Sequence, residues 1–222
     1  MNKGLETGDP SVVVIDDDTS VCEALRGLFE SVGLPTKTYG SVQAFLAAKP
    51  PDGSCCVVLD IRLPGQSGLE FQEALARSGS PQAVILISGH VDVQMAVRAM
   101  KAGAVDVLAK PVREQDLLEA VNRAIKQAAK RRKDVERMTS LQARHALLTD
   151  RERQVMALVT AGLLNKQIAE RVSIAEATVK LHRGQVMRKM GAESVPDLVR
   201  MADLLGQEND QGSGEPGPLG PL

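Results

Sequence analysis

The stretch Cys56–Gly68, with the sequence CVVLDIRLPGQSG, decides the fold of this chain. Its apolar, β-branched start predicts a strand that is buried on both faces and that ends at the carboxylate of Asp60. Pro64 and Gly65 then break the strand pattern, and a helical pattern follows. In an open parallel sheet, functional groups collect beyond the carboxyl ends of the strands, so we expect Asp60 to lie there and to face water.

The composition is that of an ordinary globular protein. The 222 residues are 43% hydrophobic and 25% charged, which suits one large domain or two small ones. No apolar run approaches the roughly 18 residues that cross a bilayer, and the N-terminus lacks a signal pattern. We therefore expect a cytoplasmic protein without a membrane partner. The three cysteines are too few for a disulfide framework, and Cys55–Cys56 is interpreted as packed core, with a redox sensor as the alternative.

The net charge of −1 conceals two halves of opposite sign. Residues 1–125 carry a charge of −5, residues 126–205 carry +7, and the remaining tail carries −3. An acidic half joined to a basic half indicates a division of labour, with nucleic acid as the expected partner of the second half.

Strand and helix patterns alternate through the first half of the chain. After a leader over 1–10, short apolar runs predict strands at 12–15, 36–39, 56–60, 83–87 and 105–109, with helices between them. This alternation predicts a doubly wound, five-stranded parallel sheet over residues 11–126. The predicted strands end at chemically active groups: Asp16 and Asp17, Asp60, Ser88, and Lys110.

Carboxylates that meet at one edge of a sheet repel each other, so a cation should neutralise them. Hard oxygen ligands favour Mg²⁺ over zinc or copper. With the metal bound, one carboxylate can attack a phosphoryl group, and a lysine can stabilise charge on the transferred oxygens. The hydroxyl of Ser88 can turn towards the acyl phosphate once it forms, which would link the chemistry to a change of shape.

These motifs, in this order, resemble the receiver domain of two-component response regulators, a flavodoxin/CheY-like fold. The resemblance implies that Asp60 accepts phosphate from a sensor histidine kinase and that the domain catalyses only its own phosphorylation and dephosphorylation. It implies that Mg²⁺ is bound by Asp17 and Asp60, with Asp16 assisting and the backbone carbonyl of Arg62 as a further ligand. Lys110 would pair with the phosphate, and Ser88 would be the switch hydroxyl.

One switch position departs from that family. An aromatic residue that rotates as the hydroxyl moves is usual where this chain has Val107, and valine cannot make that movement. Two outcomes are open: the backbone after Ser88 carries the signal instead, or switching is altered.

Residues 127–146 predict a helical linker that continues out of the first domain. The segment contains no glycine or proline, and its thin apolar stripe consists of Ile125, Ala128, Val135, Met138 and Leu141. The stripe fits either a solvated helical spacer or a short coiled coil with a second copy.

Residues 147–205 predict an all-α, four-helix domain. Thr149 and Glu152 form a capping-box pattern before the first helix, and Asn165 is the expected cap of the second. A tight turn then leads into a cationic helix over 176–190, and a last helix follows over 197–205. Helix, tight turn and cationic helix together form the helix-turn-helix pattern, whose second helix enters the major groove of DNA.

The motifs LTDRE (148–152), NKQIA (165–169) and ATVKLH (177–182) resemble the LuxR-type DNA-binding domain. With the receiver, residues 11–205 resemble a response regulator of the NarL/FixJ class, nearest the FixJ branch. The resemblance implies base reading at Lys180, Leu181 and Gly184. It implies that Thr178, Arg183 and Lys189 mainly hold phosphates and that Asn165 and Lys166 lie near the DNA backbone. His182 would either pack against the helix or contact a phosphate.

The resemblance also implies promoter DNA as a partner, a homodimer on activation, and RNA polymerase as a further candidate partner. The tail over 206–222 is rich in glycine, proline and acids, and is expected to be disordered.

Two other functions remain open. The run Asp16-Asp17-Asp18-Thr19 matches the start of haloacid-dehalogenase-type phosphatases, in which Asp16 would be the nucleophile, although no later acidic motif of that family is present. The second alternative is a DNA-binding regulator that does not depend on phosphorylation and uses its receiver only to dimerise. The altered residue at Val107 is the only feature that favours it.

Overall fold

The structure is a computed structural model that describes residues 10–48 and 55–212, with side chains up to Gly206. The leader over 1–9 and the tail after 212 lie outside the described residues. The chain divides into two compact units after Asp134, and each is described by itself. Among the described residues, no helix combines the length and apolar character that crossing a membrane requires.

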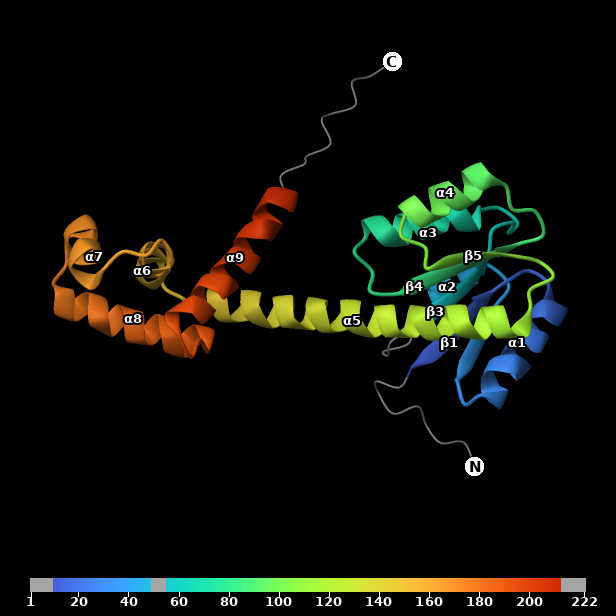
Figure 1. Cartoon of the computed structure of the whole chain (residues 1–222), viewed down its shortest axis with the longest axis horizontal. Coiled ribbons are helices and arrows are strands. Elements are labelled where there is room, and N and C mark those ends of the chain that lie inside the picture. Colours follow the sequence, from blue (N-terminus) through green and yellow to red (C-terminus); the bar gives the residue numbers. More distant parts are fainter. Residues whose placement is uncertain (1–9, 49–54, 213–222) are drawn as a thin grey trace, which may run out of the picture. The chain divides into compact units, whose positions relative to one another are not determined.

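The first unit is built on a five-stranded parallel sheet (Figure 1). The strands are β1 (Ser11–Ile15), β2 (Thr36–Tyr39), β3 (Cys55–Asp60), β4 (Ala83–Ser88) and β5 (Asp106–Ala109). Their order is β2-β1-β3-β4-β5, with β3 in the centre and buried along its whole length. The sheet confirms the predicted fold class, and it brings the carboxyl ends of β1, β3 and β5 to one edge.

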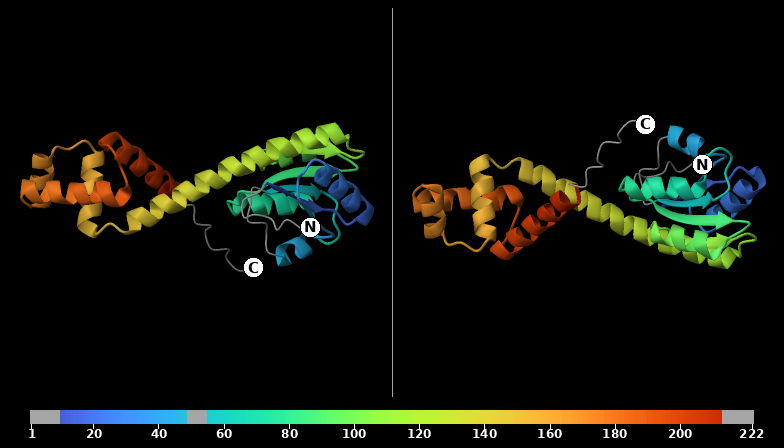
Figure 2. Two further views of the ribbon diagram at one scale, coloured as in Figure 1. Left: turned by 90° about the horizontal axis from the view of Figure 1, so that it is seen from below. Right: turned by 90° about the horizontal axis from the view of Figure 1, so that it is seen from above.

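Helices cover both faces of this sheet, as Figures 1 and 2 show. Helix α1 (Thr19–Ser31) and the first part of α5 (Glu114–Ala146) cover one face, while α2 (Val42–Ala47), α3 (Gly68–Arg77) and α4 (Val93–Lys101) cover the other. Alternation along β3 explains the two cores, because Val57 and Leu59 pack on the α2–α4 side and Cys56 and Val58 on the α1–α5 side.

Asp18 caps the start of α1. Its side chain accepts hydrogen bonds from the Ser20 and Val21 amides. A carboxylate at this position also interacts favourably with the positive end of the helix dipole. Asp18 therefore supports α1, while its neighbours Asp16 and Asp17 form the acidic pocket.

Helix α5 is continuous, as predicted, and its apolar stripe packs within each unit. Ala128 is 1% exposed and lies in the core of the first unit, beyond the boundary expected at residue 126. Leu141 is 4% exposed and belongs to the core of the second unit, with Met138 packed against it. Val135 is left half exposed. Most of the stripe is thus explained by packing within the chain, which removes the main reason to expect a coiled coil.

The second unit consists of the end of α5 and four further helices: α6 (Asp150–Thr160), α7 (Asn165–Val172), α8 (Glu176–Met190) and α9 (Val195–Gly212). The capping box of Thr149 and Glu152 is present. The expected cap Asn165 is instead the first residue of α7, and the cap is Leu164, whose amide donates to the Gln167 side chain. The last helix runs to Gly212, so the first part of the tail that was expected to be disordered from residue 206 is helical, and the rest of that tail lies outside the described residues.

Candidate functional site

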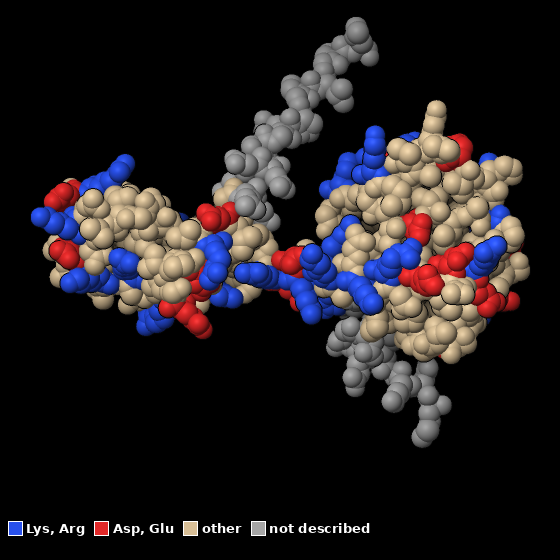
Figure 3. All heavy atoms as spheres, viewed as in Figure 1, with Lys and Arg blue, Asp and Glu red and all other residues tan. Residues whose placement is uncertain are grey.

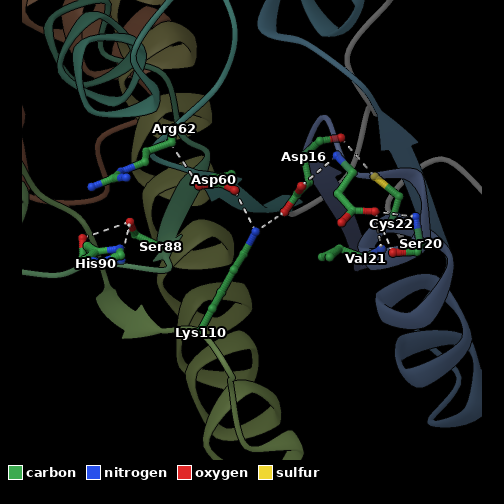
Figure 4. A network of polar contacts seen from close by, with 10 residues as sticks. Asp16, Ser20, Val21, Cys22, Asp60, Arg62, Ser88, His90 and Lys110 are labelled. Carbon is green, nitrogen blue, oxygen red and sulfur yellow. Dashed lines mark hydrogen bonds and ion pairs between the residues drawn. The ribbon is translucent and has the colours of Figure 1, made fainter.

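The predicted acidic pocket lies at the carboxyl edge of the sheet (Figure 4). Asp16 directly follows β1, Asp60 is the last residue of β3, and Lys110 directly follows β5. The Lys110 ammonium lies between the two carboxylates, with Nζ 2.6 Å from Asp16 Oδ2 and 2.6 Å from Asp60 Oδ2. Residues 94 and 50 positions apart in the sequence thus meet because all the strands are parallel and end at the same edge of the sheet, where the long Lys110 side chain reaches past β4 to β3 and β1.

Asp17 completes a cluster of three carboxylates. One oxygen from each of Asp16, Asp17 and Asp60 lies within 4.8 Å of the others. Lys110 offsets only one of the three negative charges, so the pocket favours a further cation, and its hard oxygen donors suit Mg²⁺. Asp16 and Asp60 are buried whereas Asp17 is exposed, which leaves the cluster open to solvent on one side.

The environment shifts two pKa values in this pocket. Burial raises the pKa of the Asp16 carboxyl, although hydrogen bonds from Lys110 and the Asp18 amide oppose the effect. Burial alone would lower the pKa of the Lys110 ammonium, but its hydrogen bonds to Asp16 and Asp60 outweigh this, and its pKa is raised. Lys110 therefore keeps its proton and its positive charge at the centre of the site.

The loop after β3 is held tightly against the pocket. The Arg62 amide donates to Asp60 Oδ1 at 2.9 Å, and the Gly68 amide donates to the Ile61 carbonyl at 3.0 Å. A Cβ atom on Gly68 would lie 2.1 Å from the carbonyl oxygen of Asp60, so only glycine fits at the start of α3. A hollow beside Asp17, lined by residues 61–67 and Glu70, leaves this side of the site accessible.

Ser88 ends β4 and is fully buried. Its hydroxyl donates to the His90 carbonyl at 3.0 Å and accepts from the His90 amide at 3.3 Å, as Figure 4 shows. The hydroxyl thus holds the start of the loop that leads to α4. Val107 pairs with Leu86 in the sheet and packs, half-buried, in the core shared with α4.

One residue of this region was not singled out from the sequence. Gln72 of α3 is only 2% exposed, and its Nε2 donates to the Ala102 carbonyl at 2.7 Å, at the end of α4. The Arg98 guanidinium also contacts both carboxylate oxygens of Glu73, at 2.6 and 2.9 Å. A polar residue on the apolar face of a predicted helix was the only signal in the sequence, and it does not reveal the partner.

The cysteines do not form a second site. Cys22, Cys55 and Cys56 are all buried and free. Burial raises the pKa of the Cys55 thiol to about 12 and that of Cys56 well above its usual range. Thiols with such values stay protonated and unreactive, so the structure favours packed core over a redox sensor.

The predicted DNA-reading helix is α8, with the bounds expected from the sequence. Lys180, Leu181 and Gly184 are exposed, while Val179, Val186 and Met190 are buried in the core. Thr178 and His182 are half-buried beside them, and Lys166 is exposed on α7. Arg183 donates to Asn165 Oδ1 at 2.8 Å and so ties α8 to the start of α7.

Lys189 has hydrogen-bonding partners within its own unit. Its ammonium lies 2.6 Å from Glu152 Oε2 and 3.1 Å from the Leu147 carbonyl oxygen, and its side chain is 27% exposed. Glu152 is itself 5% exposed. Lys189 therefore joins α8 to the start of α6. Its contact with a DNA phosphate stays a prediction.

Comparison with known proteins identifies both units. Residues 12–122 match the response regulator receiver domain, and residues 146–202 match the bacterial regulatory proteins of the luxR family. The chain is 44% identical to the transcriptional regulatory protein FixJ of Azorhizobium caulinodans, over 88% of this chain and 92% of that protein. The chain belongs to the response regulators of the NarL/FixJ class.

Two further relatives match this response regulator over nearly its whole length. Nodulation protein W of Bradyrhizobium diazoefficiens is 48% identical over 88% of this chain and 86% of its own. The solved structure of the response regulator StyR is 42% identical, with a TM-score of 0.78 over 88% of this chain and 99% of that one. This response regulator is therefore a transcriptional regulator with a receiver and a LuxR-type DNA-binding domain.

Proposed function

We propose that this response regulator is switched by phosphorylation of Asp60 and that the phosphorylated form binds promoter DNA. The observation that carries the proposal is the position of the Lys110 ammonium, 2.6 Å from both Asp16 and Asp60, in a cluster of three carboxylates. A fixed cation beside a carboxylate nucleophile and an excess of hard oxygen donors are what phosphoryl transfer requires.

Asp16, Asp17 and Asp60, together with the backbone carbonyl of Arg62, would hold Mg²⁺. The donor set fits this ion, because the cluster retains net negative charge after Lys110 is counted. When bound, Mg²⁺ supplies positive charge that offsets the repulsion between the carboxylates and an incoming phosphoryl group.

The chain's own residues would carry the transfer. A carboxylate oxygen of Asp60 attacks the phosphorus of a kinase phosphohistidine, so that a P–O bond forms and the P–N bond breaks. The electron pair of that bond returns to the histidine nitrogen. Lys110 already donates to Asp60 Oδ2, and it can pass to an oxygen of the transferred group without leaving the site.

Ser88 would transmit the effect of phosphorylation at Asp60 to α4. Its hydroxyl now bonds the main chain of His90, and turning it towards the phosphoryl group would release both of those hydrogen bonds. Because Val107 cannot swing as an aromatic residue does, we assign the signal to movement of the loop after Ser88. That loop leads into α4, and we infer that this movement promotes dimerisation and promoter binding, with RNA polymerase as a further partner.

Asp60 is a better acceptor than Asp16. Each carboxylate accepts from one main-chain amide and from Lys110, so their hydrogen bonds do not distinguish them. Their exposure does, because the side chain of Asp16 is 1% exposed and that of Asp60 is 10% exposed, so a phosphodonor reaches Asp60 more readily. Together with family membership, this favours the regulator over the phosphatase that would use Asp16.

The test is to map the phosphoryl group after incubation with acetyl phosphate and Mg²⁺. We expect mass spectrometry to find one phosphoryl group on the peptide that contains Asp60, and none after Asp60→Asn substitution. Omission of Mg²⁺ should suppress the label. A phosphoryl group on Asp16, with steady release of phosphate, would contradict the proposal and support the phosphatase.

A further inference from the structure

The exposed face of α8 forms one continuous stripe. Its members face away from the core and recur every three or four positions, so they lie side by side along the helix: Ala177, Lys180, Leu181, Gly184 and Arg188. We call these five residues the reading stripe. The residues of α8 on the opposite side, Val179, Val186 and Met190, are buried in the core.

The middle of the reading stripe is apolar, although the helix is cationic. Leu181 is 62% exposed, and Ala177 lies one turn before it. Gly184 lies almost one turn after Leu181, and nothing lies within 4 Å of where its Cβ would be. Packing therefore does not explain this glycine, and its missing side chain leaves space beside Leu181.

Most of the cations near Leu181 are already paired with other side chains of this unit. Arg183 donates to Asn165, and Lys189 is paired with Glu152. Lys180 is 3.9 Å from Glu176 and remains 67% exposed, so it is held only loosely. Arg188, in the last turn of α8, donates to Gln185. Lys180 and Arg188 are thus the two members of the stripe that can donate to base edges or phosphates, and they lie on either side of Leu181, whose side chain cannot form a hydrogen bond.

In the major groove, the apolar group that a base pair presents is the C5-methyl group of thymine. We propose that Leu181, with Ala177 beside it, reads thymine methyl groups in the operator of this response regulator. The inference rests on the proposed function, since it requires α8 to enter the major groove. It predicts thymine at the base pairs that face the middle of α8.

The test uses deoxyuridine, which removes only the methyl group and leaves every hydrogen-bonding edge of the base pair unchanged. Operators are first selected from random DNA duplexes with the full-length protein after acetyl phosphate treatment. Each thymine of a selected operator is then replaced in turn. At the position read by Leu181 we expect the dissociation constant to rise about fourfold, and about fifteenfold when both half-sites of a dimer operator are changed.

Two variants assign the effect to its residue. With Leu181→Ala, thymine and deoxyuridine should bind equally well at that position. Leu46→Ala serves as the matched control, because Leu46 is 60% exposed on α2 of the receiver and should leave the discrimination intact.

Each other outcome overturns a different claim. Selection of a defined operator with no effect of deoxyuridine at any thymine would refute the inference and leave the proposed function standing. A deoxyuridine effect that persists in Leu181→Ala would show that another residue reads the methyl group. Failure to select any sequence would count against the proposed function itself, and the inference would fall with it.

Discussion

Replacing Gly68 with alanine should destabilise the receiver by about 3 kcal/mol, because the new Cβ meets main chain that cannot move aside. It would lie 2.1 Å from the Asp60 carbonyl oxygen and 3.1 Å from the Ile61 Cα atom. The start of α3 would have to separate from the end of β3. That displacement should also slow phosphorylation, since Asp60 and the loop that follows it belong to the site.

Unfolding by urea, followed through Tyr39, measures this effect. Tyr39 is the only tyrosine in a chain without tryptophan, and it packs edge-on against Phe45 in the receiver. Gly27→Ala is the matched control, because Gly27 lies within α1 with nothing within 4 Å of its Cβ position. It should stabilise the receiver by about 0.5–1 kcal/mol. Equal stability of Gly68→Ala and the parent chain would show that the close contact is not structural.

Removing the ion pair between Glu152 and Lys189 should have the largest effect on the second unit. Glu152 accepts from Lys189 at 2.6 Å and from the Thr149 amide at 2.7 Å while almost fully buried. Lys189→Met leaves that carboxylate without its charged partner, so we expect a loss of about 2 kcal/mol. Arg200→Met is the control, because its ion pair with Asp197 is exposed, 3.8 Å long, and worth less than about 1 kcal/mol.

The same pair predicts a dependence of stability on pH. Hydrogen bonds from Lys189 and Thr149 lower the pKa of Glu152 from 4.5 to about 2 in the folded chain. Because the folded pKa lies below the unfolded one, the stabilisation is complete above about pH 4.5 and is lost as the pH falls towards 2. Circular dichroism follows the helices of both units, whereas Tyr39 reports only on the receiver. The loss of stability should appear in the circular dichroism transition of the second unit, and Glu152→Gln should abolish this dependence on pH. If neither Lys189→Met nor Glu152→Gln changes the unfolding transition of the second unit, the ion pair between Glu152 and Lys189 does not stabilise it.

The sequence predicted the fold because its signals were local and strong. The strand of Val57 to Leu59 is wholly apolar, and its end at Asp60 is marked by Pro64 and Gly65 a few residues later. Parallel strands end at the same edge of a sheet, so the strand pattern is sufficient to predict that Asp16, Asp60 and Lys110 lie close together. The structure places Lys110 in hydrogen-bonding contact with both carboxylates. For this reason the sequence alone is enough to identify the residues of the pocket.

Contacts between elements were less predictable. Lys189 had the appearance of a DNA-facing cation, since nothing in its neighbourhood in the sequence points to Glu152, 37 residues earlier. Asn165 was a plausible cap, but its side chain accepts from Arg183 of the next helix. Both contacts were missed for one reason: hydrogen-bonding side chains have several potential partners, and tertiary packing determines which one they meet.

The most direct test of the central claim is the affinity for a selected operator, measured with and without acetyl phosphate and Mg²⁺, in the full chain and in Asp60→Asn. We predict that phosphorylation lowers the dissociation constant of the parent chain at least fivefold, within the usual range of coupling between two sites. Asp116→Asn, at an exposed position of α5, should behave like the parent. Asp60→Asn should show no change on treatment. Operator binding that tightens equally in Asp60→Asn would contradict the account.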